Sequence, residues 1–176
     1  MKAPFTILLL LFTLSAFAQT EKVNAEGKYA FTPLTGWTVR LSGNESYVYA
    51  PADGDMDELD EKVEFSLSDG EGVELDDAFD FYIKTDFPAA YGQFKLISEG
   101  EEQINGLRAK WATFTFSAQG AVAGSSEGVS ATLQVVFYVF KKDNSLYLAN
   151  GVTKKDLFLK FDPSFRAIIR TFRIKE

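Results

Sequence analysis

The chain has 176 residues, of which 46% are apolar and 15% aromatic, so it can bury one substantial core and predicts a single domain. It carries 18 basic and 25 acidic residues, and a net charge of −7 disfavours nucleic acid as a partner because phosphate binding requires clustered Lys and Arg. It contains no Cys and no His. Their absence excludes disulfides, thiol nucleophiles, His-assisted serine catalysis and the usual zinc and copper ligands.

Residues 1–18 have the composition of a secretory signal peptide. Lys2 precedes an apolar run from Phe5 to Leu14, and Ala16-Phe17-Ala18 matches the small-residue cleavage site. The run is short for a membrane span, so an uncleaved anchor is the less favoured alternative. We therefore expect cleavage after Ala18, no stable membrane insertion after cleavage, and a secreted or periplasmic protein.

Residues 19–27 are polar and without pattern, which predicts a flexible leader ahead of a single domain over residues 28–176. Short extended segments begin this domain, each indicated by alternating apolar residues or by β-branched and aromatic content. They are expected at Tyr29–Thr32, Trp37–Leu41, Ser46–Ala50 and Val63–Leu67.

Two segments change to a helical period. The first, Glu74–Phe87, is expected to end before Pro88, because proline disfavours helical geometry in the preceding residue. The second is expected to begin with Asp162 as N-cap and Pro163 as first helical residue. The apolar positions are Leu75, Ala78, Phe79, Tyr82 and Ile83 in the first helix, and Phe165, Ile168, Ile169 and Phe172 in the second.

Between the two helices the pattern predicts an antiparallel meander with strands at Phe94–Ile104, Leu107–Phe116, Thr132–Phe140 and Leu146–Gly151. Asn105-Gly106 is a type I′ hairpin signal, and the Gly/Ser-rich segment Ser117–Ser130 predicts a long, mobile loop. Trp111 and Phe114 do not share one parity. Either a bulge interrupts their strand or both of its faces are covered.

Thr132–Phe140 (TLQVVFYVF) determines the expected architecture. It carries no charge, and its second half is apolar at every position. A half-exposed strand would alternate, so this run predicts a central strand covered on both faces; its valines and aromatics favour a strand over a buried helix. With one helix before the meander and one after it, the sequence predicts an α+β fold, a three-layer α/β/α sandwich with a mostly antiparallel sheet.

The chain resembles the PsbP-like family. The resemblance spans Lys28 to Ile174 in element order, and three stretches carry it: the entry Phe31-Thr32-Pro33-Leu34-Thr35-Gly36-Trp37, the Asn105-Gly106 hairpin, and the closing Asp162-Pro163-Ser164-Phe165 with Ile168-Ile169-Arg170-Thr171-Phe172. It implies an antiparallel sheet flanked by helices and a role in binding or assembly without a common catalytic activity. The metal association of some family members is not carried over, because no matching ligand residue exists here.

Residues 53–61 form an acidic loop with a weak likeness to a calcium-binding loop. With Asp53 as position 1, Asp55, Asp57 and Glu61 fall at positions 3, 5 and 9, and Glu64 falls at position 12. Position 6 lacks the glycine that such a loop requires, and no helical pattern flanks it. A solvated loop is the favoured interpretation, and calcium binding by Asp53, Asp55 and Asp57 is the alternative.

Two further groups of residues are candidate sites. The acid pairs Asp76-Asp77 and Glu101-Glu102 resemble a glycosidase pair, but adjacent acids point in different directions, so helix-start charge or edge solvation is favoured. Five aromatic residues are an alternative platform for sugar or lipid, but core packing is the favoured interpretation, because it explains the aromatic content without any ligand. These are Trp37, Tyr47, Tyr49, Tyr91 and Trp111.

The sequence therefore predicts an exported, non-enzymatic monomer without a cofactor, which binds an unknown envelope protein or a small ligand. The alternatives are a carboxylate-dependent hydrolase of envelope or extracellular polymers, and a calcium-responsive binding module.

Overall fold

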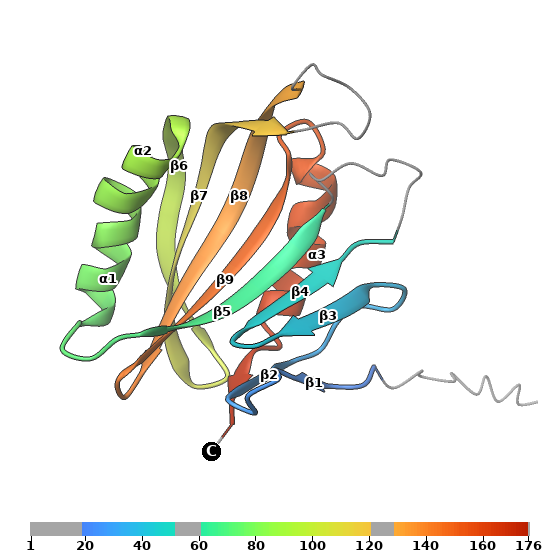
Figure 1. Ribbon diagram of the computed structural model, residues 1–176, viewed down its shortest axis with the longest axis vertical. Coiled ribbons are helices and arrows are strands. Elements are labelled where there is room, and N and C mark those ends of the chain that lie inside the picture. Colours follow the sequence, from blue (N-terminus) through green and yellow to red (C-terminus); the bar gives the residue numbers. More distant parts are fainter. Residues whose placement is uncertain (1–18, 52–60, 121–128, 176) are drawn as a thin grey trace, which may run out of the picture.

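The computed structural model describes residues 19–51, 61–120 and 129–175; the predicted signal peptide, residues 1–18, lies outside them. A seven-stranded antiparallel sheet lies between two helical layers, which confirms the predicted sandwich (Figure 1). One layer is a continuous helical segment made of α1 (Leu75–Phe81), the π-helical turn η1 (Tyr82–Asp86) and α2 (Phe87–Ala90). The other is α3 (Phe158–Ile169). Across the sheet the strands are β3 (Thr38–Ser42), β4 (Glu45–Tyr49), β5 (Lys62–Asp69), β9 (Ser145–Lys154), β8 (Val129–Lys142), β7 (Leu107–Gly120) and β6 (Gly92–Ile104).

Strand β8 contains the segment Thr132–Phe140 and is covered on both faces, as predicted. Its odd-numbered residues, such as Val135 and Phe137, pack in the core beneath α1 and α2. Its even-numbered residues, such as Val136 and Tyr138, pack in the core beneath α3. The strand lies between β9 and β7, inside the sheet, and β9 occupies the middle position. The uninterrupted apolar run thus reflects two separate cores on either side of one strand.

The first helical segment continues past Pro88, so the predicted end at this proline was wrong. The backbone N–H of Phe87 donates to the carbonyl of Tyr82, five residues back, and α2 extends to Ala90. This π turn shifts the hydrogen-bond pattern by one residue just before Pro88, which has no N–H to donate. The chain therefore keeps a helical path across the proline, and Tyr91 follows it in extended conformation.

Helix α3 begins at Phe158, earlier than the predicted start at Asp162, and Pro163 lies inside it. Pro163 has no N–H to donate to the carbonyl of Leu159, and Leu159 is 89% exposed, so the proline interrupts the hydrogen-bond pattern at an exposed residue of the helix. Phe158 and Phe161 are buried and extend the apolar stripe towards the N-terminus. Their contribution to packing outweighs the local capping signal at Asp162.

The structure of β7 shows why Trp111 and Phe114 occupy positions of opposite parity. Trp111 faces the core beneath α3 and Phe114 the core beneath α1 and α2, so both faces are covered. The irregular pairing lies on β6, between Gly92 and Lys95 and between Leu96 and Ser98. Asn105 and Gly106 both have positive φ (49° and 82°), which confirms the type I′ turn. The loop predicted at residues 117–130 is shorter than expected, because β7 continues to Gly120 and β8 begins at Val129. Residues 121–128 lie outside the described part of the chain.

A second, three-stranded sheet joins the two ends of the described chain: β1 (Lys22–Val23), β2 (Tyr29–Phe31) and β10 (Arg173–Ile174). The segment predicted as a leader, residues 19–27, includes β1, which pairs with β2. The Asn24 side chain is buried and accepts hydrogen bonds from the backbone N–H groups of Lys28 and Tyr29. This part of the segment is therefore packed on the domain.

Candidate functional site

The helical layer formed by α1 and α2 covers only one half of its side of the sheet. Helix α1 packs over β7 and β8, and α2 packs over β6, while β3, β4 and β5 extend beyond the helices (Figure 1). On this uncovered part Arg40 pairs with Tyr47, Tyr47 with Glu64, and Tyr49 with Lys62 across neighbouring strands. Paired residues point to the same face. We call the surface made by Arg40, Tyr47, Tyr49, Lys62 and Glu64 the open face.

The side chains of the open face are ordered by contacts with one another. The Lys62 ammonium lies 2.7 Å from the Glu64 carboxylate. The Arg40 guanidinium lies 4.6 Å from the centre of the Tyr47 ring, a cation–π distance. The Tyr47 hydroxyl donates to Glu45, and this hydrogen bond to a carboxylate raises the pKa of Tyr47 to about 12. The face is thus polar and aromatic, with two positive charges and one negative charge among its five side chains.

A cavity of about 200 Å³ lies where the open face meets the end of α2. Four strands and the helical segment supply its lining: Lys62, Glu64, Phe87, Tyr91, Phe114, Phe116, Leu133, Val135, Asn150 and Val152. We call it the sheet–helix pocket. Ligand sites commonly combine an apolar interior with a few placed polar groups, and this pocket has that composition.

The register of the sheet explains the two ends of the pocket. Lys62, Val152, Val135 and Phe114 form one row across β5, β9, β8 and β7, so the row changes from polar to apolar towards the helix. The next row places Glu64 beside Asn150. At the apolar end the Phe87 ring packs on Phe114 and the Tyr91 ring stacks on Phe116 with 4.2 Å between centres. A ligand would therefore bury an apolar group near the helix and place a polar group near β5.

Two polar groups in the lining lack partners within the part of the chain that the structure describes. The Asn150 amide and the Tyr91 hydroxyl are each half-buried and make no hydrogen bond there. Burial and the nearby carboxylates of Glu64 and Asp86 raise the pKa of Tyr91, which keeps its hydroxyl protonated and able to donate. Neither polar atom is fully buried, so water can reach both, and a ligand with matching polar groups can replace that water.

The structure divides the five aromatic residues weighed as a platform into two groups. Trp37 and Trp111 lie on the α3 side, where Trp37 packs edge-on against Phe165 at 6.1 Å and Trp111 lies under the Arg166 guanidinium. Tyr47, Tyr49 and Tyr91 lie half-exposed on the other side. The two tryptophans thus pack against the core beneath α3, whereas the three tyrosines belong to the open face or to the pocket. The sequence offered a signal for this division: in β4, Ser46 and Val48 alternate with Tyr47 and Tyr49, so the two tyrosines point to the opposite face from Val48.

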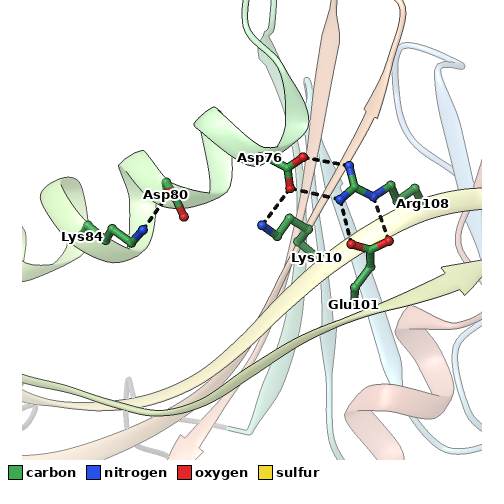
Figure 2. A network of polar contacts seen from close by, with 6 residues as sticks. All are labelled: Asp76, Asp80, Lys84, Glu101, Arg108 and Lys110. Atoms are coloured by element: carbon green, nitrogen blue, oxygen red, sulfur yellow. Dashed lines mark hydrogen bonds and ion pairs between the residues drawn. The ribbon is translucent and has the colours of Figure 1, made fainter.

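The acid pairs do not converge on a common cleft. Arg108 on β7 bonds both Asp76 on α1 and Glu101 on β6, and Lys110 lies 2.8 Å from Asp76 (Figure 2). Hydrogen bonds from Arg108 and Lys110 lower the pKa of Asp76 to about 2. These ion pairs connect the start of α1 to the β6–β7 hairpin. Asp80 and Lys84 form a separate ion pair further along the helical segment.

Glu102, the neighbour of Glu101, points to the opposite side. It accepts a hydrogen bond of 2.6 Å from the Tyr138 hydroxyl, which also accepts from Arg166 on α3. Burial acts to raise the pKa of Glu102, but hydrogen bonds from Tyr138 and Arg170 outweigh it and lower the pKa. Burial and this carboxylate raise the pKa of Tyr138. The cluster holds α3 against the sheet.

The calcium hypothesis stays a hypothesis, because Asp53, Asp55 and Asp57 lie outside the described residues. Glu61 is buried and bonds Thr153, whereas Glu64 pairs with Lys62 in the pocket. These two side chains face opposite sides of the sheet, so they do not join one ion site. Within residues 19–51, 61–120 and 129–175, no group of three or more acids is placed to hold a metal ion. None of the helices in these ranges is long and apolar enough to cross a membrane.

The fold defines a class of protein: the chain has the PsbP-like fold, an antiparallel sheet flanked by helices. The solution structure of cyanobacterial PsbP (CyanoP) from Synechocystis sp. PCC 6803 is 14% identical and aligns over 91% of this chain and 95% of its own, with a TM-score of 0.57. LpqN of Mycobacterium tuberculosis, described as involved in cell envelope biogenesis, is 11% identical over 90% of this chain and 91% of its own, with a TM-score of 0.61.

The same fold occurs in the Ran-binding protein Mog1p of Saccharomyces cerevisiae, which is 11% identical over 89% of this chain and 95% of its own, with a TM-score of 0.55. No family model matches the sequence, and no curated protein matches it at a significant level. At these identities the comparisons establish the fold and leave the site to be argued from its own residues.

Proposed function

We propose that the protein is an exported, non-enzymatic binding module of the cell envelope that holds a small ligand in the sheet–helix pocket. The observation that carries this proposal is the cavity of about 200 Å³, which is apolar towards α2 and whose described lining includes two polar groups without a hydrogen bond to the described residues, Asn150 and Tyr91. The signal-peptide pattern of residues 1–18 supports export. The shared fold with LpqN, a protein involved in cell envelope biogenesis, agrees with an envelope role.

A binding role fits the chemistry of the lining better than hydrolysis does. A hydrolase that relies on carboxylates needs two of them facing one cleft, about 5 to 10 Å apart. The described lining contributes one carboxylate, Glu64, and Lys62 already neutralises it at 2.7 Å. The chain also has no His or Cys to act as a base or nucleophile.

Fluorescence titration with N-phenyl-1-naphthylamine, an uncharged apolar probe, tests the proposal. The wild-type protein should bind the probe saturably with one site, and Val152→Trp, which places an indole in the pocket, should abolish binding. Leu133→Phe also fills the pocket, but by a smaller change, so it serves as a second test if Val152→Trp does not fold. Melting temperatures establish whether each variant is folded. Equal probe binding by wild type and by both folded variants would contradict the proposal.

A protein partner is the alternative occupant, and it would use the open face. Tyr and Arg side chains dominate the energetics of protein interfaces, and Arg40, Tyr47 and Tyr49 are presented together there. Crosslinking in the native envelope distinguishes the two: a crosslinked protein lost in Arg40→Glu but retained in Val152→Trp would favour the protein partner.

A further inference from the structure

The polar end of the sheet–helix pocket, which we call its mouth, carries one positive charge on Lys62 and one negative charge on Glu64. These two charges restrict which small ligands the pocket can bind. Lys62 and Glu64 lie on the same strand and the same face, and both line the pocket. Resting on the proposed function, we infer that the ligand is a zwitterionic apolar α-amino acid, with its side chain in the apolar interior, its carboxylate on Lys62 and its ammonium group on Glu64.

The interior fits one apolar side chain. A dry cavity of about 150 Å³ lined by aliphatic and aromatic residues is large enough to bind benzene. The pocket, at about 200 Å³, has room for a phenyl or isobutyl group together with the atoms that connect it to a polar head. Phe87, Phe114 and Val135 form this end, and the Tyr91–Phe116 stack closes its side.

The polar end offers complementary groups for both charges of such a ligand. Lys62 and Asn150 are diagonal neighbours on β5 and β9, a spacing of about 7–8 Å with somewhat less between Cβ atoms, so one carboxylate can accept from both. Glu64 stands directly opposite Asn150 and accepts from an ammonium group. The Tyr91 hydroxyl, near Glu64, is a further donor.

Charge balance argues against ligands with a single charge. Lys62 and Glu64 neutralise each other at 2.7 Å, and their side chains are only 24% and 32% exposed. An anion would be attracted by Lys62 but repelled by Glu64, and a cation would meet the reverse. A zwitterion satisfies both groups at once and adds no net charge to a partly desolvated site.

Displacement of N-phenyl-1-naphthylamine by four competitors tests the inference. L-phenylalanine and L-leucine carry both charges, 3-phenylpropionate lacks the ammonium group, and 2-phenylethylamine lacks the carboxylate. Each amino acid should displace the probe at about tenfold lower concentration than either singly charged analogue, because a charge-assisted hydrogen bond is lost with each deleted group. The advantage should shrink at high salt because the mouth is partly exposed.

Two variants assign each charge to its partner. In Lys62→Met, L-phenylalanine should lose its advantage over 2-phenylethylamine, and in Glu64→Gln it should lose its advantage over 3-phenylpropionate. Lys95→Met, which removes an exposed lysine on β6, is the matched control and should retain both advantages. Melting temperatures establish that each variant is folded.

The outcomes separate the inference from the function on which it rests. If all competitors displace the probe equally in the wild type, or if the advantage persists in both charge variants, the amino-acid inference is wrong while the pocket still binds apolar groups. If the probe itself fails to bind, the proposed function is wrong.

Discussion

Replacing Gly151 with alanine should destabilise the domain by forcing β9 and α3 apart. A Cβ atom built on Gly151 would lie 2.6 Å from both Cβ and Cγ of Phe165, distances that folded proteins do not tolerate. Phe165 is completely buried at the centre of α3, so its ring has no free space into which to move. Overpacking of this kind costs about 1–3 kcal/mol, and the buried, aromatic neighbour places Gly151→Ala near the upper end.

Alanine has a compensating advantage over glycine of about 0.5–1 kcal/mol, because glycine loses more conformational entropy on folding. The net loss for Gly151→Ala is therefore about 2 kcal/mol, which corresponds to a fall in melting temperature of about 4–8 °C for a domain of this size. Gly92→Ala is the matched control, since Gly92 also lies in a strand and its added Cβ would meet nothing nearer than the Ser117 carbonyl oxygen at 3.9 Å.

Urea unfolding followed by circular dichroism measures both changes, and a double-mutant cycle localises the effect. In a Phe165→Ala background, which removes Cγ and the ring atoms that face Gly151, the cost of Gly151→Ala should fall by about 1 kcal/mol or more. A Gly151→Ala protein as stable as Gly92→Ala would refute the close packing of α3 on β9.

The pKa of Asp76 is lowered to about 2, so its contribution to stability is full above its unfolded-state pKa of about 3.9 and is lost as pH falls towards 2; Asp76→Asn should flatten the loss of stability in acid, measured by urea unfolding, and Asp77→Asn should not. Val136→Lys should abolish cooperative unfolding because it buries a charge in the core beneath α3, whereas Thr132→Lys, on the exposed part of the same strand, should leave it intact. Millimolar Ca²⁺ should not change the melting temperature, since the acidic loop is interpreted as solvated; a rise that is lost when the aspartates of this loop become asparagines would establish the calcium alternative.

The layers of the fold were predictable because two strong patterns indicate them. A run apolar on both parities requires cover on both faces, and helical stripes before and after the meander supply the cover. The positions of the helix ends were not predictable in the same way. Pro88 and Pro163 are local signals against a helix, but a π turn bypasses the first and the burial of Phe158 and Phe161 outweighs the second.

The pocket was beyond the reach of sequence patterns for a different reason. Its lining joins four strands and the helical segment, and the register that aligns Lys62 with Val152 and Val135 arises only when the strands pair. Asn150 has the polarity of an ordinary edge residue in the sequence, and only its position within the lining makes it informative. The outward direction of Tyr47 and Tyr49, by contrast, was readable from the alternation in β4.

Methyl-region NMR of the protein titrated with N-phenyl-1-naphthylamine tests the central claim, a ligand site between α2 and the sheet, most directly. The methyl signals of Leu133, Val135 and Val152, which line the pocket, should shift in a saturable manner. Those of Ile168 and Val48, in the core on the α3 side, should stay in place and serve as an internal control. Shifts confined to the α3 side, or unchanged signals from the three lining residues at saturating probe, would contradict the account.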